Sequence, residues 1–202
     1  MAKLKVGVLI SGRGSNLAAL LRAAEAPGYP AEIACVVSNV AEAPGLAIAR
    51  AAGVPAIVLS HKDHPDRESF DRLLSAKLEQ HGVELVALAG FMRILSRWFP
   101  EHWAGRLINI HPSLLPAFKG LHVERQALAA GVRVSGCTVH LVIPDLDAGP
   151  IIAQAAVPVM LNDTAETLAA RVLIEEHRIY PEALKMVADG HVRLENGRAV
   201  FL

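Results

Sequence analysis

Two polar side chains, Asn109 and His111, end an apolar run in the stretch RLINIHPSLLPAFKG, residues 106–120. Side chains two positions apart on a β-strand point to the same face, so a strand here would present both groups at its carboxyl end. Pro112 and Pro116 cannot continue the strand pairing, and they stiffen the loop that follows. The pattern predicts a donor amide beside a titratable imidazole, at the sheet edge where open α/β proteins bind ligands. The alternative is that the pair only bonds to nearby backbone.

A glycine-rich turn, SGRGSN at residues 11–16, lies between a predicted strand and a predicted helix. Gly12 and Gly14 allow a sharp turn, and the free N–H groups at a helix start favour an anion such as phosphate. The dinucleotide fingerprint would need a third glycine where Leu17 stands, and the nucleoside-triphosphate loop would need Gly-Lys-Ser/Thr. The turn therefore suits a lone phosphomonoester, and the alternative is a tight turn that binds no ligand.

An acidic loop, PDLDAGPI at residues 144–151, separates two later strand-like runs. It carries Asp145 and Asp147, and Gly149 permits an unusual backbone angle. Loops of this kind are usually only solvated, so this one becomes part of a site if a carboxylate reaches His111.

No metal site is predicted from the histidines. His61 and His64 have a spacing that could serve a metal, but no third ligand is evident nearby, so we expect a solvated loop. His140 precedes the acidic loop on a predicted strand, which could bring it near the site.

The elements that would position these groups alternate between strand and helix along the first 110 residues, which predicts an α/β fold with a doubly wound, mostly parallel, Rossmann-like sheet. Two later strands predict an antiparallel pair added to that sheet, followed by a long helix capped at Thr164 and an Asn-Gly hairpin. Without a linker or repeat, residues 1–202 are expected to form a single domain. The predicted strands cover 5–10, 31–39, 55–60, 83–90, 106–110, 136–143 and 151–159, and the predicted helices 16–26, 44–53, 67–82, 122–131 and 164–190.

Composition limits the classes of function. Hydrophobic residues make up 52% of the 202 residues, so a substantial core is available. Lys plus Arg and Asp plus Glu both number 20, and a nucleic-acid-binding protein would need a basic surplus. The apolar run at the start is too short for a signal sequence or a membrane span, and the separated Cys35 and Cys137 indicate reduced thiols. We therefore expect a cytoplasmic protein with neither nucleic acid nor membrane as partner.

Five motifs in chain order resemble the glycinamide ribonucleotide formyltransferases, folate-dependent enzymes of purine synthesis. The motifs are SGRGSN, AGFMRIL, NIHPSLLP, GCTVHLVIPDLDAGPII and EEHRIYP, and the likeness runs from about residue 5 to residue 190. It implies transfer of a formyl group from the co-substrate 10-formyltetrahydrofolate to the amine of glycinamide ribonucleotide, without a metal. The expected partners are these two small molecules, and the oligomeric state stays open, with a homodimer as one option.

The resemblance also implies roles for single residues. Asn109, His111 and Asp147 match the family's catalytic trio: the first two would donate to the formyl oxygen, and Asp147 would orient the imidazolium or a proton-carrying water. No protein nucleophile is needed, because the amine attacks. The residues implied for ribonucleotide binding are Gly14, Ser15, Asn16 and Glu176, and those for folate binding are Arg67, Met92, Arg93, Ile94, Leu95 and Asn109.

Several alternatives stand beside this interpretation. Met92, Ile94 and Leu95 could be plain core residues, and Arg13 stands where some family members carry Asn. Methionyl-tRNA formyltransferase shares the trio but has a further C-terminal domain and a basic surface, and formyltetrahydrofolate deformylase has an extra N-terminal domain. The length and charge of this chain fit neither. A third alternative is a silent binding module, which would not require all three residues of the trio.

Overall fold

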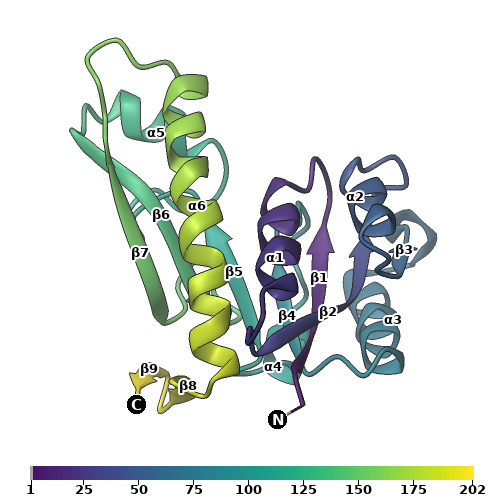
Figure 1. Cartoon of the computed structure of the whole chain (residues 1–202). Coiled ribbons are helices and arrows are strands. Elements are labelled where there is room, and N and C mark those ends of the chain that lie inside the picture. The colour runs from purple at the N-terminus through teal and green to yellow at the C-terminus, as the bar shows by residue number, and fades with distance from the viewer. Residues whose placement is uncertain (1) are drawn as a thin grey trace.

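The computed structural model describes residues 2–202, and its central feature is a seven-stranded sheet in the order β3-β2-β1-β4-β5-β6-β7 (Figure 1). Neighbouring strands from β3 to β5 pair in parallel, whereas β6 is antiparallel to β5 and to β7. The predicted fold class is thereby confirmed. The strands of the sheet are β1 (Leu4–Ile10), β2 (Ala31–Ser38), β3 (Ala56–Val58), β4 (Leu85–Leu88), β5 (Leu107–His111), β6 (Val134–Leu141) and β7 (Ile151–Pro158).

Helices cover both faces of this sheet, as the doubly wound pattern requires. One core cluster packs the sheet against α1 and α6, which lie in front of it in Figure 1, and a second packs it against α3 and α4. The helices are α1 (Ser15–Glu25), α2 (Gly45–Ala51), η1 (a 3₁₀ turn, His61–Asp63), α3 (Arg67–Gln80), α4 (Trp98–His102), α5 (Val123–Ala129) and α6 (Ala165–Ala188). Of the described residues, none belongs to a helix long and apolar enough to cross a bilayer.

Two predicted local signals are confirmed at the end of the chain. Thr164 caps α6 in a capping box, in which Thr167 N donates to Thr164 Oγ1 and Thr164 N donates to Thr167 Oγ1. The hairpin of β8 (Val192–Glu195) and β9 (Arg198–Phe201) turns at Asn196 and Gly197, with φ of 49° and 74°. Both turn residues are left-handed, as a two-residue hairpin of type I′ requires.

The short helix α4 was not predicted, because the segment WFPEH contains Pro100 and spans little more than one turn. Proline is tolerated there because the first N–H groups of a helix have no intrahelical acceptor. The helix buries Phe99, and the following Trp103 donates from Nε1 to Ser75 Oγ of α3. These contacts fix α4 against α3, at the end of the loop that follows β4.

Candidate active site

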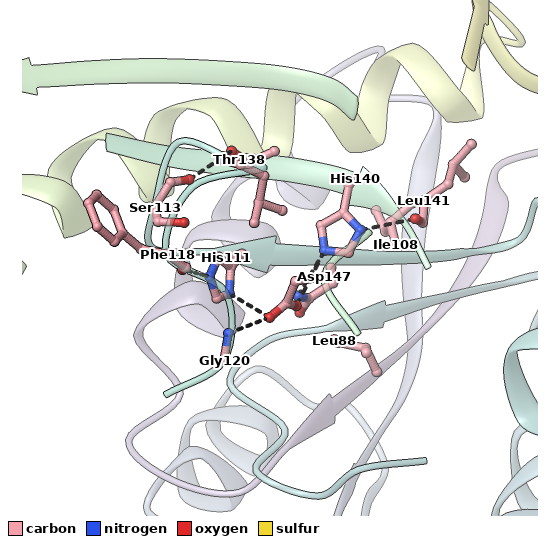
Figure 2. Close-up of polar contacts among 12 residues, drawn as sticks. Leu88, Ile108, His111, Ser113, Phe118, Gly120, Thr138, His140, Leu141 and Asp147 are labelled. Carbon is pink, nitrogen blue, oxygen red and sulfur yellow. Dashed lines mark hydrogen bonds and ion pairs between the residues drawn. The ribbon is translucent and has the colours of Figure 1, made fainter. Parts of the chain in front are cut away.

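The carboxyl end of β5 and the loop between β6 and β7 bring Asn109, His111 and Asp147 together (Figure 2). The strand alternation puts Asn109 and His111 on one face, as expected for positions two apart. Antiparallel pairing then sets Asn109 opposite His140 of β6. Figure 2 shows Asp147 between the rings of His111 and His140, so the loop returns its carboxylate to the end of β5.

His111 is only 5% exposed, and each of its ring nitrogens faces an oxygen. Nε2 lies 2.9 Å from the carbonyl oxygen of Phe118, which can only accept, so Nε2 carries a hydrogen. Nδ1 lies 3.5 Å from Oδ2 of Asp147, longer than an ordinary hydrogen bond. With a hydrogen already on Nε2, an N–H at Nδ1 requires the imidazolium form. That N–H would lie beside the Asp147 carboxylate without an ordinary hydrogen bond to it, and so could donate to an incoming oxygen.

Asp147 adopts an uncommon backbone conformation, with a φ of 45° in the left-handed region. Its Oδ2 accepts a hydrogen bond of 2.9 Å from the Gly120 amide. Gly149 lets the same loop lie directly against β6, because a Cβ there would sit 1.7 Å from the carbonyl oxygen of Leu141. The need for glycine is thus steric, and the left-handed residue of the loop is Asp147 itself.

His140 determines how the Asn109 amide points. Its Nδ1 lies 3.0 Å from the carbonyl oxygen of Leu141, so Nδ1 carries the hydrogen. Nε2 is then an acceptor, and Asn109 Nδ2 donates to it at 3.2 Å. Burial lowers the pKa of His140, in keeping with a neutral ring. The second hydrogen of Asn109 Nδ2 remains for a ligand.

The glycine-rich turn leads into α1, and its two glycines differ in what they require. Gly14 has a φ of 77°, and a Cβ on it would lie 2.6 Å from the Cα of Gly45 at the start of α2. A Cβ on Gly12 would meet no atom within 4 Å, and the Gly12 carbonyl accepts from the Gly45 amide at 3.0 Å. Only Gly14 is therefore required by both backbone angle and close approach. Ser15 is the first residue of α1, so Gly14 and Ser15 form the start of the helix.

Two residues predicted to bind the ribonucleotide contact each other across 160 positions of sequence. Asn16 Nδ2 donates to Glu176 Oε2 of α6 at 2.7 Å, and both side chains are buried. Burial raises the pKa of Glu176, and the Asn16 hydrogen bond partly opposes that shift. Asn16 Oδ1 is also buried and has no hydrogen-bond partner among residues 2–202. The pair thus offers an acceptor and a carboxyl group at the start of α1.

The residues expected to bind folate lie around the loop between β4 and α4. Met92 and Ile94 are 69% and 60% exposed, which excludes the alternative that they belong to the core. Leu95, in contrast, packs against the second core cluster. The Arg93 guanidinium lies over the Phe70 ring, 4.8 Å from its centre. Arg67 is exposed at the start of α3, and among residues 2–202 no contact places it against Asn109, His111 or Asp147.

The described part of the chain holds no cluster of three or more His, Cys, Asp or Glu arranged for a metal. His61 and His64 instead meet the Phe70 ring edge-on, and His61 Nδ1 lies 3.3 Å from Asn39 Nδ2.

Beside Asp147 there is an open cavity of about 360 Å³, lined by Leu115, Pro116, Lys119 and residues 147–151.

A family model described as formyl transferase matches residues 4–184. The chain belongs to the formyl transferase family. It is 44% identical over 196 residues to phosphoribosylglycinamide formyltransferase of Escherichia coli (strain K12), covering 97% of this chain and 92% of that protein. Among solved structures, glycinamide ribonucleotide transformylase 1 from Symbiobacterium toebii matches with a TM-score of 0.96 and 48% identity, covering 99% and 94% of the two chains.

Two other relatives differ in length from this formyl transferase. The trifunctional purine biosynthetic protein adenosine-3 of Bos taurus is 53% identical over 201 residues, 99% of this chain, and the chain spans only 20% of that protein's length. A formyltetrahydrofolate deformylase from Pseudomonas syringae pv. tomato matches with a TM-score of 0.91 and 30% identity, covering 99% of this chain and 66% of that one. Neither relative's further activities are implied for this chain.

Proposed function

We propose that the chain transfers the formyl group of 10-formyltetrahydrofolate to the amine of glycinamide ribonucleotide, giving formylglycinamide ribonucleotide and tetrahydrofolate. The observation that carries the proposal is the convergence of Asn109, His111 and Asp147 at the carboxyl end of β5, with an amide, a buried imidazole and a half-buried carboxylate in one cluster. Such a cluster suits a reaction in which charge builds on one carbonyl oxygen.

In this reaction the amine nitrogen bonds to the formyl carbon, the bond from that carbon to the folate nitrogen breaks, and a proton passes from the amine to the folate nitrogen. The formyl oxygen gains negative charge as the amine attacks. The free hydrogen of Asn109 Nδ2 and an N–H at His111 Nδ1 would donate to it, and Asp147, 3.5 Å away, would stabilise the imidazolium. Asp147 could also hold a water that carries the proton. The amine is the nucleophile, so no covalent enzyme intermediate is needed.

The same proposal assigns the two substrates to two neighbouring regions. The ribonucleotide phosphate would meet the backbone of Gly14 and Ser15 at the start of α1, and its sugar would meet Asn16 and Glu176. The folate would contact the loop of Met92, Arg93, Ile94 and Leu95, with Arg67 and Asn109. The exposure of Met92 and Ile94 supports this, because apolar side chains there are free to pack on a flat ring.

The test is to follow release of deformylated folate by absorbance, with and without glycinamide ribonucleotide, in the wild-type protein and in His111→Ala. Turnover that requires the ribonucleotide and collapses in the variant supports the transferase. Turnover without the ribonucleotide would instead indicate a deformylase, the activity named for one structural relative. Folded protein that binds both ligands without turnover would indicate a binding module.

A further inference from the structure

The segment between β4 and α4 belongs to neither helix nor strand, yet it carries four of the predicted folate contacts. Residues 92–96, here called the folate loop, therefore rely on partners elsewhere to satisfy their main-chain N–H groups. At its first residue, Met92 N donates to Ser11 Oγ at 2.8 Å. At its last, Ser96 N donates to Asp71 Oδ2 at 2.5 Å. Two side chains from distant elements thus hold the two ends.

Ser11 is itself held firmly where β1 ends. Its amide donates to the carbonyl of Gly90 at 3.1 Å, and its hydroxyl donates to Asn39 Oδ1 at 2.5 Å while accepting from Met92. The residue that begins the glycine-rich turn therefore also fixes the start of the folate loop. Both donor and acceptor capacities of its hydroxyl are in use.

Asp71 is a wholly buried carboxylate on α3, with 0% of its surface exposed. The Ser96 amide is bonded to one oxygen, and the other oxygen has no hydrogen-bond partner among residues 2–202. No ion pair within 4.0 Å compensates the charge in that part of the chain, although Arg93 and Arg67 act on it electrostatically from further away. A carboxylate buried in this way destabilises a fold unless its hydrogen bonds offset the burial. Its one strong contact is with the folate loop.

We infer that Asp71 and Ser11 are positioning residues that hold the folate loop at its two ends and thereby determine the affinity for the folate co-substrate. The inference rests on the proposed function. Neither side chain needs to touch the folate. Asp71 fixes where Arg93 to Ser96 lie, and Ser11 fixes where Met92 leaves the sheet. When either contact is lost, the loop also populates conformations that cannot bind the folate. The apparent affinity is then the intrinsic affinity multiplied by the fraction of molecules whose loop is in the binding conformation.

The experiment compares Asp71→Ala, Asp71→Asn, Ser11→Ala and the control Ser75→Ala. Ser75 lies four residues after Asp71 on the same helix, is equally buried, and accepts from Trp103 Nε1 instead of from the folate loop. For each variant we measure KM for the 10-formyl folate donor, KM for glycinamide ribonucleotide, kcat, and Tm.

Asp71→Ala is expected to raise KM for the folate by about tenfold to a hundredfold, the range for a lost hydrogen bond to a charged group, with a much smaller change in kcat. Asp71→Asn keeps an oxygen acceptor for Ser96 N and is expected to restore most of the affinity. Ser11→Ala is expected to raise the same KM by a smaller factor, because its bond to Met92 is between neutral groups. Ser75→Ala should lower Tm and leave the folate KM unchanged.

The inference is overturned if folded Asp71→Ala and Ser11→Ala keep the wild-type folate KM, or if Ser75→Ala raises it equally, which would indicate a general loss of packing. If Asp71→Ala does not fold, Ser11→Ala decides the question, with Ser75→Ala as its control. Wild-type protein without ribonucleotide-dependent turnover would refute the proposed function instead. In that case the Kd of the 10-formyl folate donor, measured by titration calorimetry, takes the place of KM. Wild-type protein that does not bind the donor would overturn both.

Discussion

Gly14 and Gly12 look equivalent in the SGRGSN turn, but only the replacement of Gly14 by alanine should lower activity and stability. In Gly14→Ala the new Cβ would lie 2.6 Å from the Cα of Gly45, where ordinary contact begins at 3.4 Å, so the backbones must separate by about 0.8 Å. The left-handed φ of 77° adds roughly 1–2 kcal/mol of strain for alanine. Gly12→Ala meets nothing within 4 Å and serves as the matched control.

The shift matters because Gly14 and Ser15 begin the helix that would hold the ribonucleotide phosphate. Misplacement of a binding group by about 1 Å can lower a rate by roughly a hundredfold, whereas the backbone strain lowers the stability of the fold and not the rate. We therefore expect kcat/KM for glycinamide ribonucleotide to fall by about tenfold to a hundredfold in Gly14→Ala. The folate KM should change less, because the Ser11 contacts with Asn39 and Met92 involve neither Gly14 nor Gly45.

The assay is the absorbance measurement of folate release, with ribonucleotide varied at saturating folate and then the reverse, alongside Tm. Gly14→Ala should lose Tm, by about 2–4 °C per kcal/mol for a chain of this size. The reasoning fails if folded Gly14→Ala keeps the wild-type kcat/KM for the ribonucleotide. It also fails if Gly12→Ala loses as much, since the control has neither the close approach nor the positive φ.

Three further predictions follow from single contacts. His111→Ala should lower kcat by about a hundredfold or more with small changes in both KM values, because the proposed donor to the formyl oxygen is lost; steady-state kinetics would contradict this if kcat stayed within tenfold. Tyr180→Phe removes a buried hydroxyl that donates to the carbonyl of Leu88 at 2.9 Å, so urea unfolding should show about 1–3 kcal/mol less stability; no loss would mean that the bond adds nothing. Burial raises the pKa of Glu176, so its ionised form destabilises the native state as pH rises above about 4.5. The Tm of Glu176→Gln should therefore exceed that of wild type at pH 8, and the difference should vanish toward pH 4. A difference in Tm that does not depend on pH would count against burial as the cause.

Elements with strong local signals were predictable from the sequence. The helix α6 carries its own capping residue at Thr164, and the final hairpin carries an Asn-Gly turn, so both are encoded within a few residues. The placement of Asn109 and His111 on one face of the strand was predictable for the same reason, since strand alternation depends on spacing alone. Their functional roles came from the resemblance, and the assignments remain predictions.

Contacts between distant segments could not be predicted. The hydrogen bond that Asn109 donates to His140 depends on the antiparallel register of β5 and β6, which the long connection between the two strands leaves open. The bond between Asn16 and Glu176 joins α1 to α6 only after the sheet has formed. Met92 and Ile94 show a different difficulty: an apolar run beside a buried strand reads as core, and only the exposed path of the folate loop shows otherwise.

Three features of the candidate site lower the stability of the fold. Asp147 holds a left-handed backbone that costs about 1–2 kcal/mol in a non-glycine residue. Glu176 and Asp71 are buried carboxyl groups, and neither forms an ion pair within the described part of the chain. An apolar side chain of similar size would pack at these two positions without that penalty. All three lie in or next to the proposed substrate regions: Asp147 beside His111, Glu176 bonded to Asn16 at the start of α1, and Asp71 bonded to the folate loop. A fold selected for stability alone would have no reason to keep them, so their coincidence with the two proposed substrate regions is itself an argument for catalysis.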